Sequence, residues 1–328
     1  MGKLSTADME MFSRLRISPE LVAAAGIERV TDGEAREQYG IVGHGDMTGI
    51  VFPYLVPDGS HRRVTCRLRR DHPEIEDRRP RRKYVAPFGD ARHLYFPPGA
   101  AELLKDQRTE IVFVESEKAA LALLEWSRRV GLRLLPVATG GCWGWRGRIG
   151  KTVDAAGVRV DETGPLPDLL CAERRRVYIL FDVNAATNAD VQKARSAFAA
   201  ELRKRRAEVA ILNLPSESGI NGPDDFLAAN TDHDMARVFE RPKVEPEIKV
   251  GSAREDTSNA ERFASQHKDL VRFWHGRNKW VLWKGTHWAE DVDGQVAELA
   301  KETARSIYSE AAGLPKRPSA WGGGPSAA

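Results

Sequence analysis

The sequence predicts an α/β protein: a mostly parallel β-sheet flanked by helices, with a basic α+β region before it and a small Trp-rich unit after it. Three observations predict this arrangement. Between residues 108 and 240, short apolar runs alternate with helix-length amphipathic segments, which is typical of parallel βαβ units with right-handed crossovers. Residues 61–83 hold ten Lys/Arg against four acidic residues, and residues 270–291 hold four tryptophans.

The N-terminal part is expected to contain a short helix and a β-hairpin. Ser18 is a favourable N-cap, and Pro19 suits the first turn of the helix that follows it. Residues 49–56 and 62–69 are strand-like, and the Pro-Asp-Gly sequence at 57–59 is typical of the turn between two such strands.

The predicted sheet is built from short runs rich in β-branched and aromatic residues. These runs occupy residues 110–115, 133–139, 175–182 and 208–215. Helices are expected over residues 116–131 and from about Asn188 onward, the second with Val191, Ala194, Phe198 and Leu202 on one face. Residues 146–172 fit this alternation poorly and are expected to form an insertion or a long loop.

The C-terminal part is expected to form a helix, a hairpin-like segment and a second helix. The four tryptophans of the hairpin-like segment, Trp274, Trp280, Trp283 and Trp288, fit a small β core better than a platform for base stacking. The predicted division of the chain is a basic α+β region at 1–107, an α/β domain at 108–240, a Pro- and charge-rich linker at 241–258 and the Trp-rich unit at 259–328.

Composition excludes several classes of protein. The chain has 328 residues, 41% hydrophobic and 30% charged, which excludes wholesale disorder. Its net charge of +3 is too small for a global attraction to polyanions, so local clusters must carry any binding of nucleic acid. The three cysteines form no CxxC pair, so we expect no zinc site and a reducing, cytoplasmic location. No apolar run is long enough to span a membrane.

Acidic residues stand where an α/β sheet places its chemistry. Glu115 and Asp182 end two of the predicted strands, and ligands of such sheets bind outside the carboxyl ends of the strands. If these strands are neighbours, the two acids converge, with Glu117, Asn184 and the pair Asp224–Asp225 within reach. Clustered oxygen ligands suit Mg²⁺. The alternative is that these acids only cap helices and complement helix dipoles.

The combined pattern resembles the Toprim domain of phage and plasmid replication primases and primase-helicases. The motifs are FVESEKAALAL, a Gly-Gly-x-Trp-Gly-Trp turn, ILFDVNAATNADVQKA and LPSESGINGPDDFLAA. The upstream segments GIVFPYLVPDG and CRLRRDHPE are similar to those that precede this domain in such proteins. The C-terminal NKWVLWKGTHWAED resembles the region before the helicase of primase-helicases, so the resemblance covers nearly the whole chain.

The resemblance implies a role for each matching residue. Glu115 is the general acid/base, and Asp182 holds Mg²⁺ or Mn²⁺ together with Asp224 and Asp225. Asn184 stands where the family has a second Asp and could coordinate only through its amide oxygen, which weakens a site for a hard cation. Glu117 and Lys118 follow Glu115 within the same motif.

The basic segment is the candidate surface for single-stranded DNA, since cations can follow a phosphate backbone and aromatic rings can stack on bases. The alternative is a solvated hairpin face with internal ion pairs. The candidate contacts are Arg62, Arg63, Arg67, Arg69, Arg70, Arg81, Arg82, Lys83 and Tyr84.

Three functions follow from this reading. The first is a primase-like component of phage or plasmid DNA replication that performs Mg²⁺-dependent nucleotidyl transfer on single-stranded DNA, uses nucleoside triphosphates and has a replicative helicase as a candidate partner. The second is a catalytically impaired, nucleic-acid-binding adaptor on a Toprim scaffold, which Asn184 favours. The third is a Toprim nuclease. Restoring Asp at position 184 distinguishes the first two.

Overall fold

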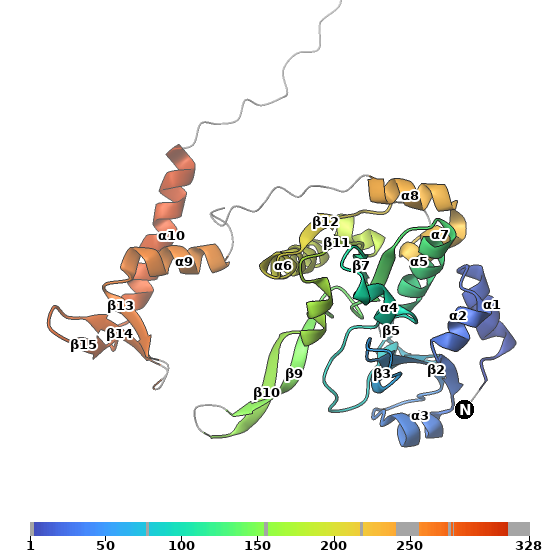
Figure 1. Cartoon of the computed structure of the whole chain (residues 1–328). Coiled ribbons are helices and arrows are strands. Elements are labelled where there is room, and N and C mark those ends of the chain that lie inside the picture. Colours follow the sequence, from blue (N-terminus) through green and yellow to red (C-terminus); the bar gives the residue numbers. More distant parts are fainter. Residues whose placement is uncertain are drawn as a thin grey trace, which may run out of the picture. The chain divides into compact units, whose positions relative to one another are not determined.

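The computed structural model describes residues 3–76, 79–153, 157–216, 219–240, 256–274, 277 and 279–313. The chain divides into two compact units, Met1–Glu245 and Pro246–Ala328, which are called the first and second unit below (Figure 1). Among the described residues, none of the helices combines the length and apolar character that crossing a membrane requires.

The centre of the first unit is a four-stranded, fully parallel sheet in the order β12-β11-β7-β8. Its strands are β7 (Glu110–Val114), β8 (Leu134–Ala138), β11 (Arg176–Ile179) and β12 (Glu208–Ile211). The predicted α/β class and its four strands are therefore confirmed. Pro136 lies in β8, an edge strand of this sheet, where the missing N–H breaks no internal ladder.

Helices cover both faces of this sheet because apolar side chains alternate along each strand. Val112 and Val114 of β7 belong to one core cluster with the inner face of α5 (Glu117–Arg129). Phe113, between them, packs edge-to-face on Phe198 of α6 (Ala189–Lys204) in the other cluster. Figure 1 shows α5 and α6 on opposite sides of the sheet. Ser116 and Asn188 cap the two helices through their side chains, and the second helix begins where the sequence predicts.

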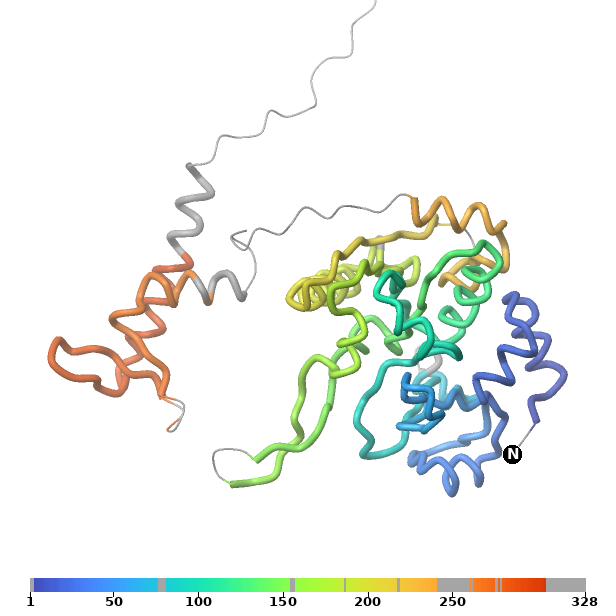
Figure 2. Tube along the Cα trace, viewed as in Figure 1, coloured from blue at the N-terminus to red at the C-terminus, as the bar shows by residue number. Residues whose placement is uncertain are grey.

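The N-terminal region is not a separate body. Its antiparallel sheet has the order β1-β2-β3-β6, and the predicted hairpin is present as β2 and β3. Phe12, Leu21 and Phe52 share a core cluster with Val112 of the parallel sheet, so the predicted boundary at 107/108 lies inside one compact unit. Figure 2 shows the N-terminal helices next to α5. The elements of this region are α1 (Thr6–Arg14), α2 (Pro19–Ala24), β1 (Glu28–Val30), α3 (Asp32–Tyr39), β2 (Gly49–Leu55), β3 (Arg63–Arg70), β4 (Glu74–Glu76), β5 (Arg79–Arg81), β6 (Tyr84–Val85) and α4 (Ala100–Lys105).

Residues 146–172 form an ordered insertion between β8 and β11, which is one of the two expected alternatives, and not a long loop. They form an antiparallel ribbon of β9 (Arg146–Val153) and β10 (Arg159–Pro165), followed by the 3-10 helix η1 (Pro167–Ala172). The sequence does not reveal the ribbon because most of its side chains are exposed, so no apolar alternation marks it. The remaining elements of the unit are η2 (Val183–Ala186), α7 (Pro223–Ala229) and α8 (Asp232–Glu240).

The second unit packs two helices on a three-stranded antiparallel sheet. Val271, Leu282 and Val296 form its buried core. Its elements are α9 (Asp256–His267), β13 (Val271–Trp274), β14 (Lys279–Trp283), β15 (Trp288–Glu290) and α10 (Gln295–Gly313). Most of the predicted linker, residues 241–255, lies outside the described residues. The prediction that the tryptophans fill a core is wrong for three of them: Trp274 is 50% exposed, Trp280 is 42% exposed and Trp283 is 37% exposed.

A buried ion pair fixes α1 to the sheet of the N-terminal region and predicts a pH effect. Burial raises the pKa of Asp8, but hydrogen bonds from Arg29 and Ser5 outweigh it and lower the pKa to about 2. Because the folded pKa is depressed, the stabilisation is complete above the unfolded pKa of about 3.9 and is lost as the pH falls towards 2. We expect about 2 kcal/mol of acid-labile stability from this carboxylate.

The measurement is urea unfolding at neutral pH and at pH values below that of the free carboxyl group. Asp8→Asn removes this part of the acid dependence, whereas Glu37→Gln, at an exposed carboxylate on α3, keeps it. Equal acid dependence of wild type and Asp8→Asn would contradict the assignment.

Candidate active site

Two adjacent parallel strands bring Glu115 and Asp182 together. β7 and β11 are paired in parallel, and each of these residues follows the carboxyl end of its strand. The backbone N–H of Asp182 donates to Oε1 of Glu115 over 3.2 Å. The convergence that the sequence predicts for these two residues therefore exists in the structure.

The start of α7 completes the acidic cluster. The backbone N–H of Val183 donates to the carbonyl of Asn221 over 2.8 Å, which fixes the loop before α7 to the end of β11. Gly222 then passes between two carboxylates: a Cβ at this position would lie 2.8 Å from Oδ1 of Asp182 and 2.9 Å from Oδ1 of Asp224. Asp224 is buried, while Asp225 accepts a hydrogen bond from the backbone of Asn221.

The surroundings of the cluster favour the protonated form of Glu115 and Asp182. Burial raises the pKa of Glu115, although backbone amides of Asp182 and Cys142 donate to its carboxylate and oppose that shift. Burial also raises the pKa of Asp182, and the negative charges of Glu115, Asp224 and Asp225 raise it further, to about 8. Such a carboxylate is easily neutralised by a proton or a cation.

Lys118 supplies positive charge to this cluster. Its Nζ lies 3.3 Å from Oδ2 of Asp224, and its charge counteracts the rise in the pKa of Asp182. Burial lowers the pKa of Lys83, and the charges of Arg69 and Lys118 lower it further. Basic residues of β3 and of the segment before β6 therefore lie close to the acidic strand ends, so the two predicted surfaces adjoin each other.

Glu117 has a different place from the other acids. Its carboxylate is 1% exposed, accepts a hydrogen bond from the hydroxyl of Tyr54 over 2.6 Å and pairs with Nη1 of Arg67 over 3.2 Å. The guanidinium of Arg67 also stacks on the ring of Tyr84, 4.3 Å from its centroid. Glu117 thus fixes the hairpin of the N-terminal region to α5.

The predicted basic residues divide into exposed and buried groups. Arg70 is 2% exposed; it pairs with Glu74 and donates to the carbonyl of Asp46, so it holds the surrounding loops together. Arg67 is engaged with Glu117 as described. The exposed members of the set are Arg62, Arg63, Arg81 and Arg82, and the partly exposed ones are Arg69, Lys83 and Tyr84.

A cavity of about 380 Å³ opens beside the turn that follows β8. It is lined by Tyr54 and Arg67 from the hairpin, by Gly140 after β8, and by further basic side chains, namely Arg92, His93 and Arg148. A Cβ at Gly140 would lie 3.1 Å from Nη1 of Arg67, so the glycine lets this turn approach the guanidinium closely.

Sequence reasoning missed three parts of the site. The space between Asp182 and Asp224 exists because Gly222 has no side chain. The carboxylate of Glu115 accepts a hydrogen bond from the backbone amide of Cys142. The Gly-Gly pair before Cys142 signals a tight turn, but only the fold shows that the turn meets the end of β7, where the N–H of Gly141 donates to the carbonyl of Glu115. The position of Glu117 is the third part.

The donor chemistry fits Mg²⁺ or Mn²⁺. Asp182 and Asp224 present carboxylate oxygens on either side of Gly222, and Asp225 adds negative charge nearby. Mg²⁺ is usually held by one or two carboxylates together with water and substrate phosphates. Within the described residues, no group of three or more His, Cys, Asp or Glu side chains is arranged to hold a metal by itself. Asn184, in η2, has an exposed side chain.

Two family descriptions match parts of the chain. A family described as a domain of unknown function, DUF3854, matches residues 101–234 and therefore includes the acidic cluster. A family described as "D5 N terminal like" matches residues 260–320. The second match lies on the segment that the sequence predicts to be a pre-helicase unit, so the predicted resemblance to a primase-like replication region is confirmed at that level. Neither description names a Toprim domain, which stays a prediction.

The chain is also similar to three solved structures of primases, with low sequence identity. The Aquifex aeolicus primase (zinc-binding and RNA polymerase domains) is 16% identical with a TM-score of 0.49, over 92% of this chain and 67% of that chain. The RNA polymerase domain of the Mycobacterium tuberculosis primase is 11% identical, TM-score 0.46, over 92% and 90%. The primase fragment of the bacteriophage T7 primase-helicase is 12% identical, TM-score 0.38, over 73% and 79%. No curated protein matches.

Proposed function

We propose that the chain is a primase-like component of phage or plasmid DNA replication that carries out Mg²⁺-dependent nucleotidyl transfer on single-stranded DNA. The observation that carries this proposal is the meeting of Glu115, Asp182 and Asp224 at the carboxyl ends of two neighbouring parallel strands, next to Lys118. It is also supported by the match of the C-terminal unit to the D5 family.

Each residue of the cluster has a separable task. Asp182 and Asp224, with Asp225 or Asn184, would hold the metal, which when bound would neutralise charge on the phosphates of an incoming nucleoside triphosphate. Glu115 would accept the proton of the attacking 3′-hydroxyl, since its carboxylate lies next to this position and is oriented by backbone amides. Lys118 would contact a phosphate oxygen.

The template strand would lie on the exposed basic residues. Arg62, Arg63, Arg81 and Arg82 are accessible to a phosphate backbone, and Arg69 and Lys83 would continue this surface towards the acidic cluster. A replicative helicase would be the partner that supplies single-stranded DNA.

Primer synthesis on single-stranded DNA with labelled ribonucleotides and Mg²⁺ or Mn²⁺ tests the proposal. Glu115→Gln should lower the rate by about 10²–10⁴-fold, the usual contribution of a general base. The matched control is Glu110→Gln, at the amino end of the same strand, where the carboxylate bonds to Tyr178 instead. Product that depends on Glu110 as strongly as on Glu115, or no product from wild type, would contradict the proposal.

The second candidate is a catalytically impaired adaptor that binds nucleic acid, and the exposed amide of Asn184 favours it. Asn184→Asp distinguishes the two. An enzyme that lacks one charged ligand should bind Mg²⁺ about tenfold more tightly after this change and synthesise more product. A binder should retain DNA in a gel shift with no product from either variant, and a nuclease would shorten DNA without nucleotides.

A further inference from the structure

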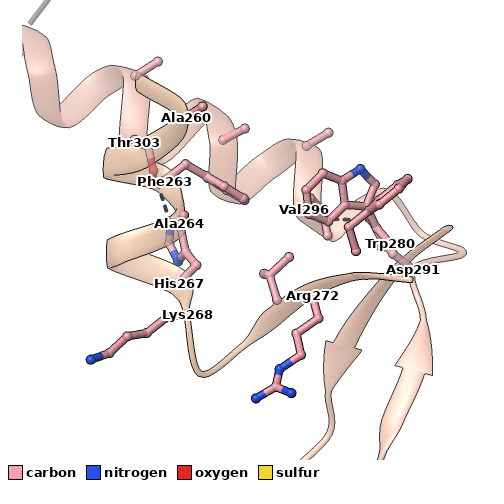
Figure 3. A pocket seen from close by; sticks show the side chains of 15 residues that line it. Ala260, Phe263, Ala264, His267, Lys268, Arg272, Trp280, Asp291, Val296 and Thr303 are labelled. Carbon is pink, nitrogen blue, oxygen red and sulfur yellow. Dashed lines mark hydrogen bonds between the residues drawn. The ribbon is translucent and has the colours of Figure 1, made fainter. Parts of the chain in front are cut away.

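The sheet of the second unit has two chemically different faces. Strand pairing places Val271 opposite Leu282, and Phe273 opposite Trp280. These four side chains face the helices: Val271 and Leu282 belong to the core with Val296, and Trp280 packs edge-to-face on Phe263 of α9. Figure 3 shows Trp280 turned towards Val296, whereas Arg272 points away from both helices.

The residues that alternate with these four along β13 and β14 therefore point to the opposite, outer face of the sheet. Trp274 pairs with Lys279, and Trp283 with Trp288. We call the outer face the tryptophan face; its members are Arg272, Trp274, Lys279, Val281, Trp283, Trp288 and Glu290, with Arg272, the buried Val281 and Glu290 in the central row. Trp274 is 50% exposed and Trp283 is 37% exposed, so the outer face presents accessible aromatic rings; Trp280 of the inner face is also 42% exposed.

Cations lie directly on these rings. The guanidinium of Arg272 is 4.7 Å from the ring centroid of Trp288, and that of Arg277 is 4.6 Å from the ring centroid of Trp274. The carboxylate of Glu290 on the same face is neutralised by Lys279, at 2.5 Å. Among the described residues of this face, the arginines thus leave an excess of positive charge at the aromatic surface.

We propose that the tryptophan face binds single-stranded nucleic acid through base stacking. Exposed aromatic planes interleaved with Arg and Lys provide stacking for bases and attraction for phosphates, and guanidinium planes stack on bases as well. A protein partner is the alternative occupant, since aromatic residues and Arg are also enriched in protein interfaces, and the leucine and phenylalanine variants below distinguish the two. This surface belongs to the second unit and is additional to the basic segment of the first unit on which the proposed function relies.

The geometry provides two stacking positions. Trp274 lies opposite Lys279 at one end of β14, and the Trp283–Trp288 pair lies at the other end, with ring centroids 5.3 Å apart. Each residue of an antiparallel strand rises about 3.4 Å, so two positions four residues apart are about 14 Å apart along β14. Bases that are not adjacent in the strand would therefore occupy the two positions, with Arg272 between them.

Photocrosslinking and affinity measurements on the full chain test this proposal. An oligothymidylate carrying 5-iodouracil is irradiated with the protein, and crosslinked peptides are identified by mass spectrometry. We expect crosslinks within residues 271–290. The variant Trp274→Leu/Trp283→Leu should lose these crosslinks and bind oligothymidylate at least about tenfold more weakly, because each lost stack weakens binding by about that factor.

The matched control is Trp274→Phe/Trp283→Phe, which keeps an aromatic plane at both positions and should retain most of the affinity. If leucine binds as well as phenylalanine, the face is an apolar protein interface or has no ligand, and the proposal fails. Crosslinks of wild type confined to residues outside 271–290 would also overturn it. Primer synthesis by Glu115→Gln is independent of these readouts, so failure of the proposed function is recognised separately.

Discussion

Glu117→Leu is expected to lower the free energy of unfolding of the first unit by about 3–5 kcal/mol. The carboxylate is 1% exposed and is shared by the hydroxyl of Tyr54 and the guanidinium of Arg67. Its removal leaves a partly buried cation without its counter-charge and a buried hydroxyl without its acceptor, and each loss adds a desolvation cost. Urea unfolding followed by tryptophan fluorescence measures the change.

The double variant Glu117→Leu/Arg67→Met provides the matched control. It replaces both charges by apolar side chains of similar length, which is often neutral for a buried ion pair, so it should recover most of the stability lost in the single variant. Additive losses in the double variant, or a loss below about 1 kcal/mol in Glu117→Leu, would show that the pair does not fix the hairpin to α5.

Glu117 also shows where sequence reasoning reaches its limit. The strand ends at Glu115 and Asp182 are predictable, because β-branched runs separated by helices imply a parallel sheet and its carboxyl edge. The partner of Glu117 is not, since Arg67 is 50 residues away in an antiparallel hairpin of another sheet. Two acids in one motif therefore differ in role: one lies in the acidic cluster, and the other holds two parts of the unit together.

The N-terminal region shows the same limit: its local structure is predictable from the sequence, but its long-range packing is not. Local signals such as the Pro-Asp-Gly turn and the Ser18 cap correctly predict its hairpin and helix. They do not show that Phe12 and Phe52 pack in one cluster with Val112 of the parallel sheet, because apolar periodicity gives a buried face but not its partner. The predicted boundary at 107/108 therefore lies within one compact unit.

For the tryptophans of the second unit, the sequence does not reveal which face of the sheet each side chain lies on. Strand pairing decides which of them face the helices. Trp280 pairs with Phe273 and faces the helices, whereas Trp274 and Trp283 lie on the other face of the sheet. A shift of one residue in register would exchange the two faces, and composition alone carries no information on register. A count of four tryptophans therefore predicts a core, whereas the register places Trp274, Trp283 and Trp288 on the outer face.

Gly222→Ala is expected to reduce primer synthesis about 10²-fold while leaving the fold intact. The backbone of Gly222 has a φ of −130°, which alanine adopts without strain, so the first unit should unfold at the same urea concentration as wild type. The added Cβ would lie within 3 Å of an oxygen of Asp182 and of Asp224, and both carboxylates must move. Metal sites require their ligands within about 0.5 Å of the productive position.

A second readout separates loss of the metal from loss of catalysis. If Asp182 and Asp224 hold Mg²⁺, the metal stabilises the folded state by mass action, and the unfolding temperature of wild type rises with its concentration. Gly222→Ala should need about tenfold more Mg²⁺ for the same rise. The matched control is Gly33→Ala in α3, where no atom lies within 4 Å of the new Cβ, so Mg²⁺ dependence and activity should both equal those of wild type. Unchanged Mg²⁺ dependence in Gly222→Ala would mean that the two aspartates do not share a cation, since the new Cβ displaces both of them at once.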